Sequence, residues 1–133
     1  MRFTVDRLDH LVITCRDVAK TSSWYQRVLG MEHEEYGRNR RCALKYGGQK
    51  INLRPVDMDP YVWVAAREPV AGSDDLCFVS PVSIPDVIGH LQDCGVAIEA
   101  GPVEREGALG PMMSVYCRDH DGYLVEIASY MRG

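Results

Sequence analysis

An internal repeat constrains the fold of this chain more than any other feature. The segment DHLVIT (9–14) aligns with DDLCFV (74–79) at an offset of 65 residues. CALKYGGQKINLR (42–54) aligns with YCRDHDGYLVEIA (116–128) at an offset of 74 residues, so the second copy carries nine more residues than the first. Because a repeat in register indicates a repeated supersecondary unit, the sequence predicts two copies of one module.

Both copies show the same order of secondary-structure signals, which is a strand, a helix and three further strands. In the first copy, Asp17 is suited to cap a helix and Gly30 to end it. In the second copy, Ser83 or Pro85 begins the helix and Gly95 ends it. Turn sequences rich in glycine and aspartate separate the later strands. The sequence therefore predicts an α+β fold with the order βαβββ twice.

The length of 133 residues suits a single domain. Within it we predict a first module over residues 5–56, a linker over 57–72 and a second module over 73–131, with a curved mixed sheet that encloses a cleft. The stretch GPVEREGALGPMM (101–113) is rich in glycine and proline, so we expect it to hold the nine-residue insertion as a loop.

Alternation along the four best strands sorts their side chains into two faces. His10, Asn52, Asp75 and Glu126 share one face, and the repeat makes His10 equivalent to Asp75 and Asn52 equivalent to Glu126. One imidazole and two carboxylates on a partly apolar face are typical of a divalent-metal site, although each residue alone could be an ordinary surface group. The opposite face is uniformly hydrophobic and is expected to meet the helices: Leu11, Ile13, Ile51, Leu53, Leu76, Phe78, Val125 and Ile127.

Composition narrows the classes of partner. The net charge is −4 and no run of lysines or arginines is present, which argues against a nucleic-acid partner. No apolar run approaches the ~20 residues of a membrane span, and no signal peptide opens the chain. The five cysteines are scattered and include no C-x-x-C pair, which favours reduced thiols. We therefore expect a cytoplasmic protein that acts on a small molecule.

Two motifs carry a resemblance to a known family. DHLVIT…WYQRVLGM and RDHDGYLVEI resemble the vicinal oxygen chelate superfamily, which includes glyoxalase I, fosfomycin-resistance enzymes, extradiol dioxygenases and bleomycin-binding proteins. GGQKINLR and PVAGSDDLCF look like its subgroup named glyoxalase-domain-containing protein 5. The resemblance implies paired βαβββ modules and places the four ligand positions of the superfamily on His10, Asn52, Asp75 and Glu126. It also implies a homodimer in which His10 and Asn52 come from one subunit and Asp75 and Glu126 from the other.

These residues predict a glyoxalase-like metalloenzyme of the lyase or isomerase type. His10, Asp75 and Glu126 are expected to hold one divalent ion (Mn, Fe, Co, Ni, Zn or Mg), which leaves positions for a small oxygenated metabolite that chelates through two oxygens. The ion would act as a Lewis acid toward an oxyanion or enolate, with Glu126 as the catalytic base. Asn52 is expected to contact the substrate or bind the ion weakly.

Two arginines are candidates to bind the substrate. Arg54 shares the face of Asn52 and could meet a carboxylate or phosphate, whereas its ordinary role would be a surface charge. Arg105 lies in the predicted 101–113 loop, which could act as a lid over the site or be a mobile surface loop.

The same residues argue for and against particular reactions. In the glyoxalase I enzymes that this chain resembles, glutamate stands at the position of Asn52. An amide cannot act as a base, so we do not expect glyoxalase I activity. The extradiol dioxygenases of the superfamily look like a metal site of two histidines and one carboxylate. This chain has Asp75 in place of the second histidine, which argues against that reaction. Two alternatives stay open: an extradiol dioxygenase, and a metal-free protein that sequesters an antibiotic or other ligand, as bleomycin-resistance proteins do.

Overall fold

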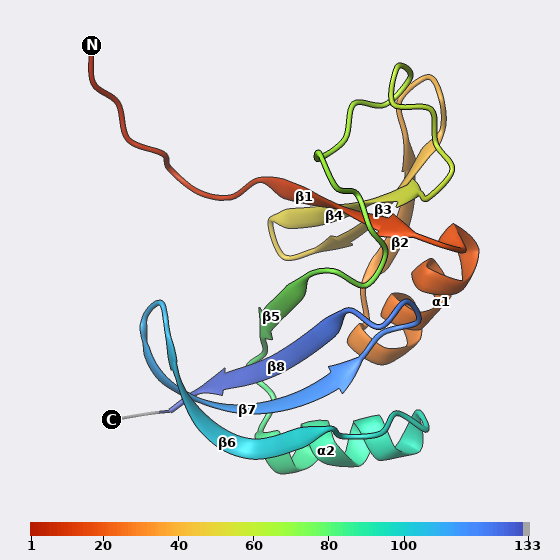
Figure 1. Ribbon diagram of the computed structural model, residues 1–133. Helices are drawn as coiled ribbons and strands as arrows, with labels where there is room; N and C mark the ends of the chain where they lie inside the picture. Colours follow the sequence, from red (N-terminus) through yellow and green to blue (C-terminus); the bar gives the residue numbers. More distant parts are fainter. Residues whose placement is uncertain (132–133) are drawn as a thin grey trace. The chain divides into compact units, whose positions relative to one another are not determined.

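The computed structural model describes residues 1–131 and has the predicted order of elements (Figure 1). Two compact units divide the chain, one covering Met1–Val70 and one beginning at Ala71. Each contains a helix and a four-stranded mixed sheet, which confirms the α+β prediction. The elements are β1 (His10–Cys15), α1 (Val18–Leu29), β2 (Glu32–Tyr36), β3 (Arg41–Tyr46), β4 (Gln49–Pro55), β5 (Asp75–Val79), α2 (Ile84–Asp93), β6 (Ala100–Gly107), β7 (Gly110–Arg118) and β8 (Leu124–Tyr130).

The two sheets have the same topology, as the repeat predicts. The strand order is β1-β4-β3-β2 in the first unit and β5-β8-β7-β6 in the second. In each, the first strand runs parallel to the last strand and the other pairs are antiparallel. The helix supplies the crossover that a parallel pair requires.

The helices begin and end where the capping signals indicate. The Asp17 carboxylate accepts a 3.0 Å hydrogen bond from the backbone N–H of Lys20, and Gly30 ends α1 in the left-handed region at φ 65°. Ser83 caps α2 through the backbone N–H of Asp86. Gly95, at φ 72°, follows the C-cap of α2. No helix in the described part of the chain is long and apolar enough to cross a membrane.

The registers confirm the two faces predicted for each sheet. Val12 lies beside Asn52 in the first unit, and Cys77 lies beside Glu126 in the second. On the opposite face of each sheet the central side chains form the core, and those with at most 5% exposure include Ile13, Leu44, Ile51, Leu53, Val115, Val125 and Ile127.

Residues 101–113 are not the loop that we expected. They form most of a β-hairpin, with β6 and β7 joined at Ala108 and Leu109. The prediction failed because charged residues and glycines are common in loops, but an edge strand such as β6 accommodates both. Arg105 therefore lies on a paired strand opposite Met112 and not on a lid.

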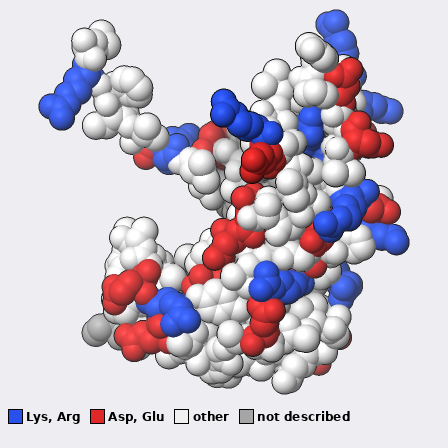
Figure 2. Space-filling model, in the orientation of Figure 1, with Lys and Arg blue, Asp and Glu red and all other residues white. Residues whose placement is uncertain are grey.

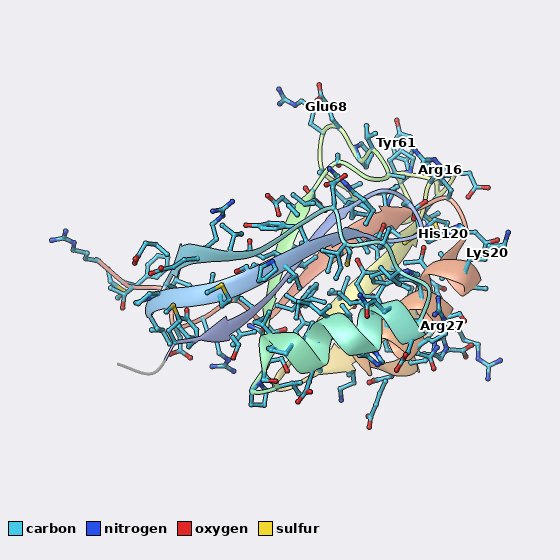
Figure 3. All side chains as sticks on the ribbon, turned by 90° about the horizontal axis from the view of Figure 1, so that it is seen from below. Arg16, Lys20, Arg27, Tyr61, Glu68 and His120 are labelled. Atoms are coloured by element: carbon cyan, nitrogen blue, oxygen red, sulfur yellow. The ribbon has the colours of Figure 1, made fainter. Side chains whose placement is uncertain are left out.

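The segment 56–74, which contains the predicted linker over 57–72, has no helix or strand. Tyr61 and Glu68 project outward from it in Figure 3, and Tyr61 is 96% exposed. Trp63, in contrast, is only 7% exposed. This residue anchors the connection to the first unit.

Candidate functional site

In the first unit, Asn52 occupies the centre of β4 with its side chain on the predicted site face. Its neighbours in the sheet are Val12 on β1 and Ala43 on β3. The residue is 5% exposed, and its Oδ1 atom has no hydrogen-bond partner among the described residues. A buried carbonyl oxygen without a donor is costly, so this atom is available to a ligand.

His10 is the first residue of β1 and lies at the same side of the sheet. Its side chain is 44% exposed, and Nδ1 lies 2.9 Å from the Asp9 carboxylate. This hydrogen bond lowers the pKa of Asp9. The carboxylate beside one ring nitrogen orients the imidazole, which is how histidine ligands of metals are commonly held.

Arg54 lies two residues beyond Asn52 on the same face, but it is 2% exposed. Its guanidinium donates hydrogen bonds of 3.0 Å and 3.1 Å to the carbonyl oxygens of Met58 and Trp63. The Nε atom has no partner among the described residues. Arg54 therefore fastens the linker to the sheet and retains one buried donor.

In the second unit, Glu126 lies at the centre of β8 and is 9% exposed. Its carboxylate accepts a 2.7 Å hydrogen bond from Ser114 Oγ. Cys77 on β5 and Tyr116 on β7 are its neighbours in register. No ion pair of Glu126 occurs among residues 1–131, so no cation is paired directly with this buried carboxylate there.

The groups around Glu126 are held in their protonated forms. Burial raises the pKa of Cys77 to about 11, and the Glu126 charge adds to the effect. Burial also raises the pKa of Tyr116, while the hydrogen bond from Arg105 opposes this shift. Arg105 Nε donates that bond to the Tyr116 hydroxyl at 3.1 Å. Tyr116 thus lies between Arg105, which bonds its hydroxyl, and Glu126, its neighbour in the sheet.

Asp75 is the first residue of β5, the position equivalent to that of His10 in β1, and it is exposed beside Leu124. The first unit thus supplies two of the four predicted ligand positions, and the second unit supplies the other two. In the part of the chain that the structure describes, no three His, Cys, Asp or Glu side chains gather as a metal cluster.

Sequence reasoning missed Ser114 and Tyr116, which contact or flank Glu126. Both lie on β7, and the pairings Ser114 with Ala128 and Tyr116 with Glu126 place them on the same face. The alternation S-V-Y beside a recognised strand was the available signal. It remained hidden because the preceding residues were assigned to a loop. Basic and acidic side chains are interspersed over the face drawn in Figure 2.

Comparison with known proteins agrees with this architecture. Residues 7–127 match the Glyoxalase/Bleomycin resistance protein/Dioxygenase superfamily. The chain is 43% identical to virulence protein STM3117 of Salmonella typhimurium, over 98% of this chain and 89% of that protein. The crystal structure of STM3117 superposes with a TM-score of 0.92, covering 97% of this chain and all of the other.

Two further proteins extend the comparison. The glyoxalase domain-containing protein RDO1 of Mycosarcoma maydis is 47% identical over 97% of this chain and 71% of its own length. Lactoylglutathione lyase from Agrobacterium tumefaciens is only 19% identical, covers 95% of each chain and has a TM-score of 0.69, so it shares the fold. With nearly its whole length matched, this chain belongs to the Glyoxalase/Bleomycin resistance protein/Dioxygenase superfamily.

Proposed function

We propose that the protein is a glyoxalase-like, divalent-metal-dependent enzyme of the lyase or isomerase type that acts on a small oxygenated metabolite. His10, Asp75 and Glu126 are the proposed metal ligands. The resemblance to the glyoxalase-domain-containing protein 5 subgroup and the similarity to RDO1, a glyoxalase domain-containing protein, support a glyoxalase-type role. We further propose a cytoplasmic homodimer in which both subunits contribute residues to each site.

One observation carries this proposal, and it comes from the repeat. The equivalent positions Asn52 and Glu126 both place a buried oxygen on the site face of a sheet. Asn52 Oδ1 lacks a donor, and Glu126 lacks a cationic partner among the described residues. A buried carboxylate without a counter-charge is unfavourable by several kcal/mol. A cation bound between oxygen donors would relieve both.

The donor set suits such an ion chemically. Two carboxylates and one imidazole match Mn, Fe, Co, Ni or Zn, and oxygen-rich ligation also accepts Mg. The Ser114 hydroxyl fixes one Glu126 oxygen at 2.7 Å and so orients the carboxylate. When bound, the ion would supply Lewis acidity that stabilises negative charge developing on a substrate oxygen.

Residues of the chain are proposed to remove the substrate proton and to bind the substrate. Glu126 is the proposed base that removes a substrate proton, since Asn52 cannot accept one. Asn52 orients the substrate through its amide. The Nε atom of Arg54 and the guanidinium of Arg105 are proposed to bind an anionic group of the substrate. This assignment disfavours glyoxalase I activity. Enzymes of that type use two carboxylates, and this chain has Asn52 at one of the two positions.

Metal content tests the proposal directly. Purified untagged protein is stripped with chelator, reloaded separately with Mn²⁺, Co²⁺, Ni²⁺ or Zn²⁺, and analysed by inductively coupled plasma mass spectrometry after gel filtration. We expect near-stoichiometric uptake of at least one ion, and loss of that uptake in His10→Ala, Asp75→Asn and Glu126→Gln. Asp74→Asn is the matched control, because Asp74 precedes β5 and contributes its backbone carbonyl to Leu124.

Binding of a bidentate oxygen ligand provides the second measurement. Acetohydroxamate should bind the metal-loaded protein in calorimetry and should not bind the stripped protein. If the unsubstituted protein takes up no ion, or if Glu126→Gln retains as much metal as the unsubstituted protein, the proposed ligand set is wrong. A ligand-sequestering role would then be the better account.

A further inference from the structure

A cavity of about 280 Å³ lies in the first unit beside the first residue of α1. Arg40, Arg41 and Cys42 line it at the start of β3. Asn39, in the turn before β3, is a further polar lining residue. The rest of the lining is apolar and comes from α1, β4 and the connection that follows β4: Val18, Leu53, Pro55, Met58, Val62 and Trp63.

The Cys42 side of this cavity is on the opposite face of the first sheet from His10 and Asn52. Cys42 pairs with Leu53, and both line the cavity, whereas the next residue, Ala43, pairs with Asn52. Because adjacent residues of a strand point to opposite faces, the thiol of Cys42 lies on the face that α1 covers. The Cys42 thiol therefore does not lie on the face of the first sheet that carries His10 and Asn52.

Two arginines give the cavity a positively charged edge. The Arg41 guanidinium carbon lies 4.0 Å from the centre of the Trp63 ring, and its NH2 group donates a 3.1 Å hydrogen bond to the Val62 carbonyl. These contacts hold Arg41 in place. Because a guanidinium has five N–H donors, Arg41 has further donors that could bind an anion. Arg40 Nε lies 3.6 Å from the Glu35 carboxylate in an exposed pair, which is weak. An anion with an apolar body matches these walls.

The Cys42 thiol is paired with a histidine. Its Sγ lies 3.3 Å from His33 Nδ1, and the same nitrogen lies 2.8 Å from Ser22 Oγ. Gln26 Nε2 donates a 3.0 Å hydrogen bond to that hydroxyl. Ser22 is buried on α1, so the imidazole is held against the thiol by two contacts from the helix and sheet.

This arrangement places a potential base beside the thiol. Burial raises the pKa of Cys42, the Ser22 hydrogen bond opposes the shift and the Glu35 charge adds to it. The thiol is therefore protonated at neutral pH and needs a base to become a nucleophile. An imidazole nitrogen within hydrogen-bond distance is the usual base for this purpose.

We propose that this cavity is a second ligand site, for a small carboxylate with an apolar body, and that Cys42 acts there as a nucleophile with His33 as its base. Iodoacetate is a suitable probe, because it is a carboxylate that carries an electrophilic carbon. Cys42 Sγ bonds to the methylene carbon, iodide leaves, and the thiol proton passes to His33 Nδ1. Iodoacetamide is the neutral counterpart and normally alkylates simple thiols faster than iodoacetate.

The experiment measures the alkylation rate of each cysteine in the full-length protein by peptide mass spectrometry. The expected result is a reversed order at Cys42, with iodoacetate faster than iodoacetamide. Cys94 is the internal control, because its Sγ also lies near an imidazole, at 3.6 Å from His90 Nε2, and it does not line the cavity. At Cys94 the ordinary order should hold.

Variants separate the two parts of the proposal. Arg40→Gln should lower the iodoacetate rate at Cys42 by about fivefold, which corresponds to ~1 kcal/mol, the upper range for an exposed charge pair. Arg38→Gln, in the same turn and outside the cavity lining, should leave the rate unchanged. His33→Gln should slow both reagents at Cys42 equally. If Cys42 and Cys94 show the same reagent order, or if Cys42 reacts with neither reagent, the proposal is overturned.

Discussion

Ser114 Oγ donates a 2.7 Å hydrogen bond to Glu126 Oε2 across the β7–β8 pair, and both residues are buried. The register explains the contact, because Ser114 pairs with Ala128 and Tyr116 with Glu126, which places Ser114 and Glu126 diagonally on one face. The same carboxylate is the proposed base and metal ligand. The hydroxyl therefore orients the group on which the proposed function depends most.

Replacing Ser114 with alanine should destabilise the protein by about 2 kcal/mol, because a hydrogen bond to a buried charged group is lost. If the ion binds as proposed, metal affinity should also fall by about 10- to 100-fold. Urea unfolding and competition with a chelating dye measure the two effects. Ser129→Ala, on the adjacent strand, is the control and should change stability by no more than about 0.5 kcal/mol. An unchanged unfolding midpoint for Ser114→Ala would show that the hydroxyl does not support Glu126.

Arg54 joins the linker to the first sheet, so its removal should affect stability before it affects any ligand. Arg54→Met loses both carbonyl hydrogen bonds, to Met58 and Trp63, and should lower the free energy of unfolding by about 3 kcal/mol. Arg54→Lys should recover only part of this loss, since an ammonium lacks the planar fork of a guanidinium. Urea unfolding followed by tryptophan fluorescence measures both. Equal stability of Arg54→Met and the unsubstituted protein would assign Arg54 to ligand binding alone.

Local sequence signals determined most of the fold. Asp17 and Ser83 cap the helices that the sequence predicts, and the glycines after them end those helices. The repeat predicted the topology because each copy keeps the same pattern of strand and turn. β6 escaped prediction because an edge strand needs few apolar residues, and its glycines and charges are those of a loop.

The candidate site was predictable only as far as strand alternation reaches. Alternation assigned His10, Asn52 and Glu126 to the correct faces of their sheets. It could not show that Arg54 binds linker carbonyls, because no spacing rule connects a strand to an irregular segment. Nor could it bring His33 to Cys42 and Ser22, whose contacts depend on how α1 packs against the sheet. His33 is exposed, yet its ring nitrogen lies within hydrogen-bond distance of Ser22 and Cys42.

The Cys117 thiol should make stability depend on alkaline pH. Burial raises its pKa to about 11 from an ordinary value of 9.0, with the charges of Asp119 and Glu99 adding to the shift. Because the folded state favours the neutral thiol, this contribution is fully present below pH 9 and is lost as the pH rises toward 11. Urea unfolding at pH 7.5, 9 and 11 should therefore show a shrinking gap in stability between the unsubstituted protein and Cys117→Ala. A gap that stays constant over this range would contradict the shifted pKa.

Two glycines of the second unit should respond to alanine in opposite directions. Gly101 has φ 97°, and a Cβ atom there would lie 2.5 Å from the backbone oxygen of Ser114. Gly101→Ala should therefore destabilise the protein by about 2 kcal/mol or more, since backbone strain and a backbone clash combine.

Gly89 provides the matched comparison, because it lies inside α2 with nothing within 4 Å of a Cβ position. Gly89→Ala should stabilise the protein by about 0.5–1 kcal/mol, because alanine restricts the unfolded chain and favours the helix. Thermal and urea unfolding of the two variants test both signs. The clash at Gly101 also displaces the strand that carries Ser114, so Gly101→Ala should weaken the Ser114–Glu126 contact, whereas Gly89→Ala should not. Equal loss of metal binding in the two variants would refute this link between the β6–β7 packing and Glu126.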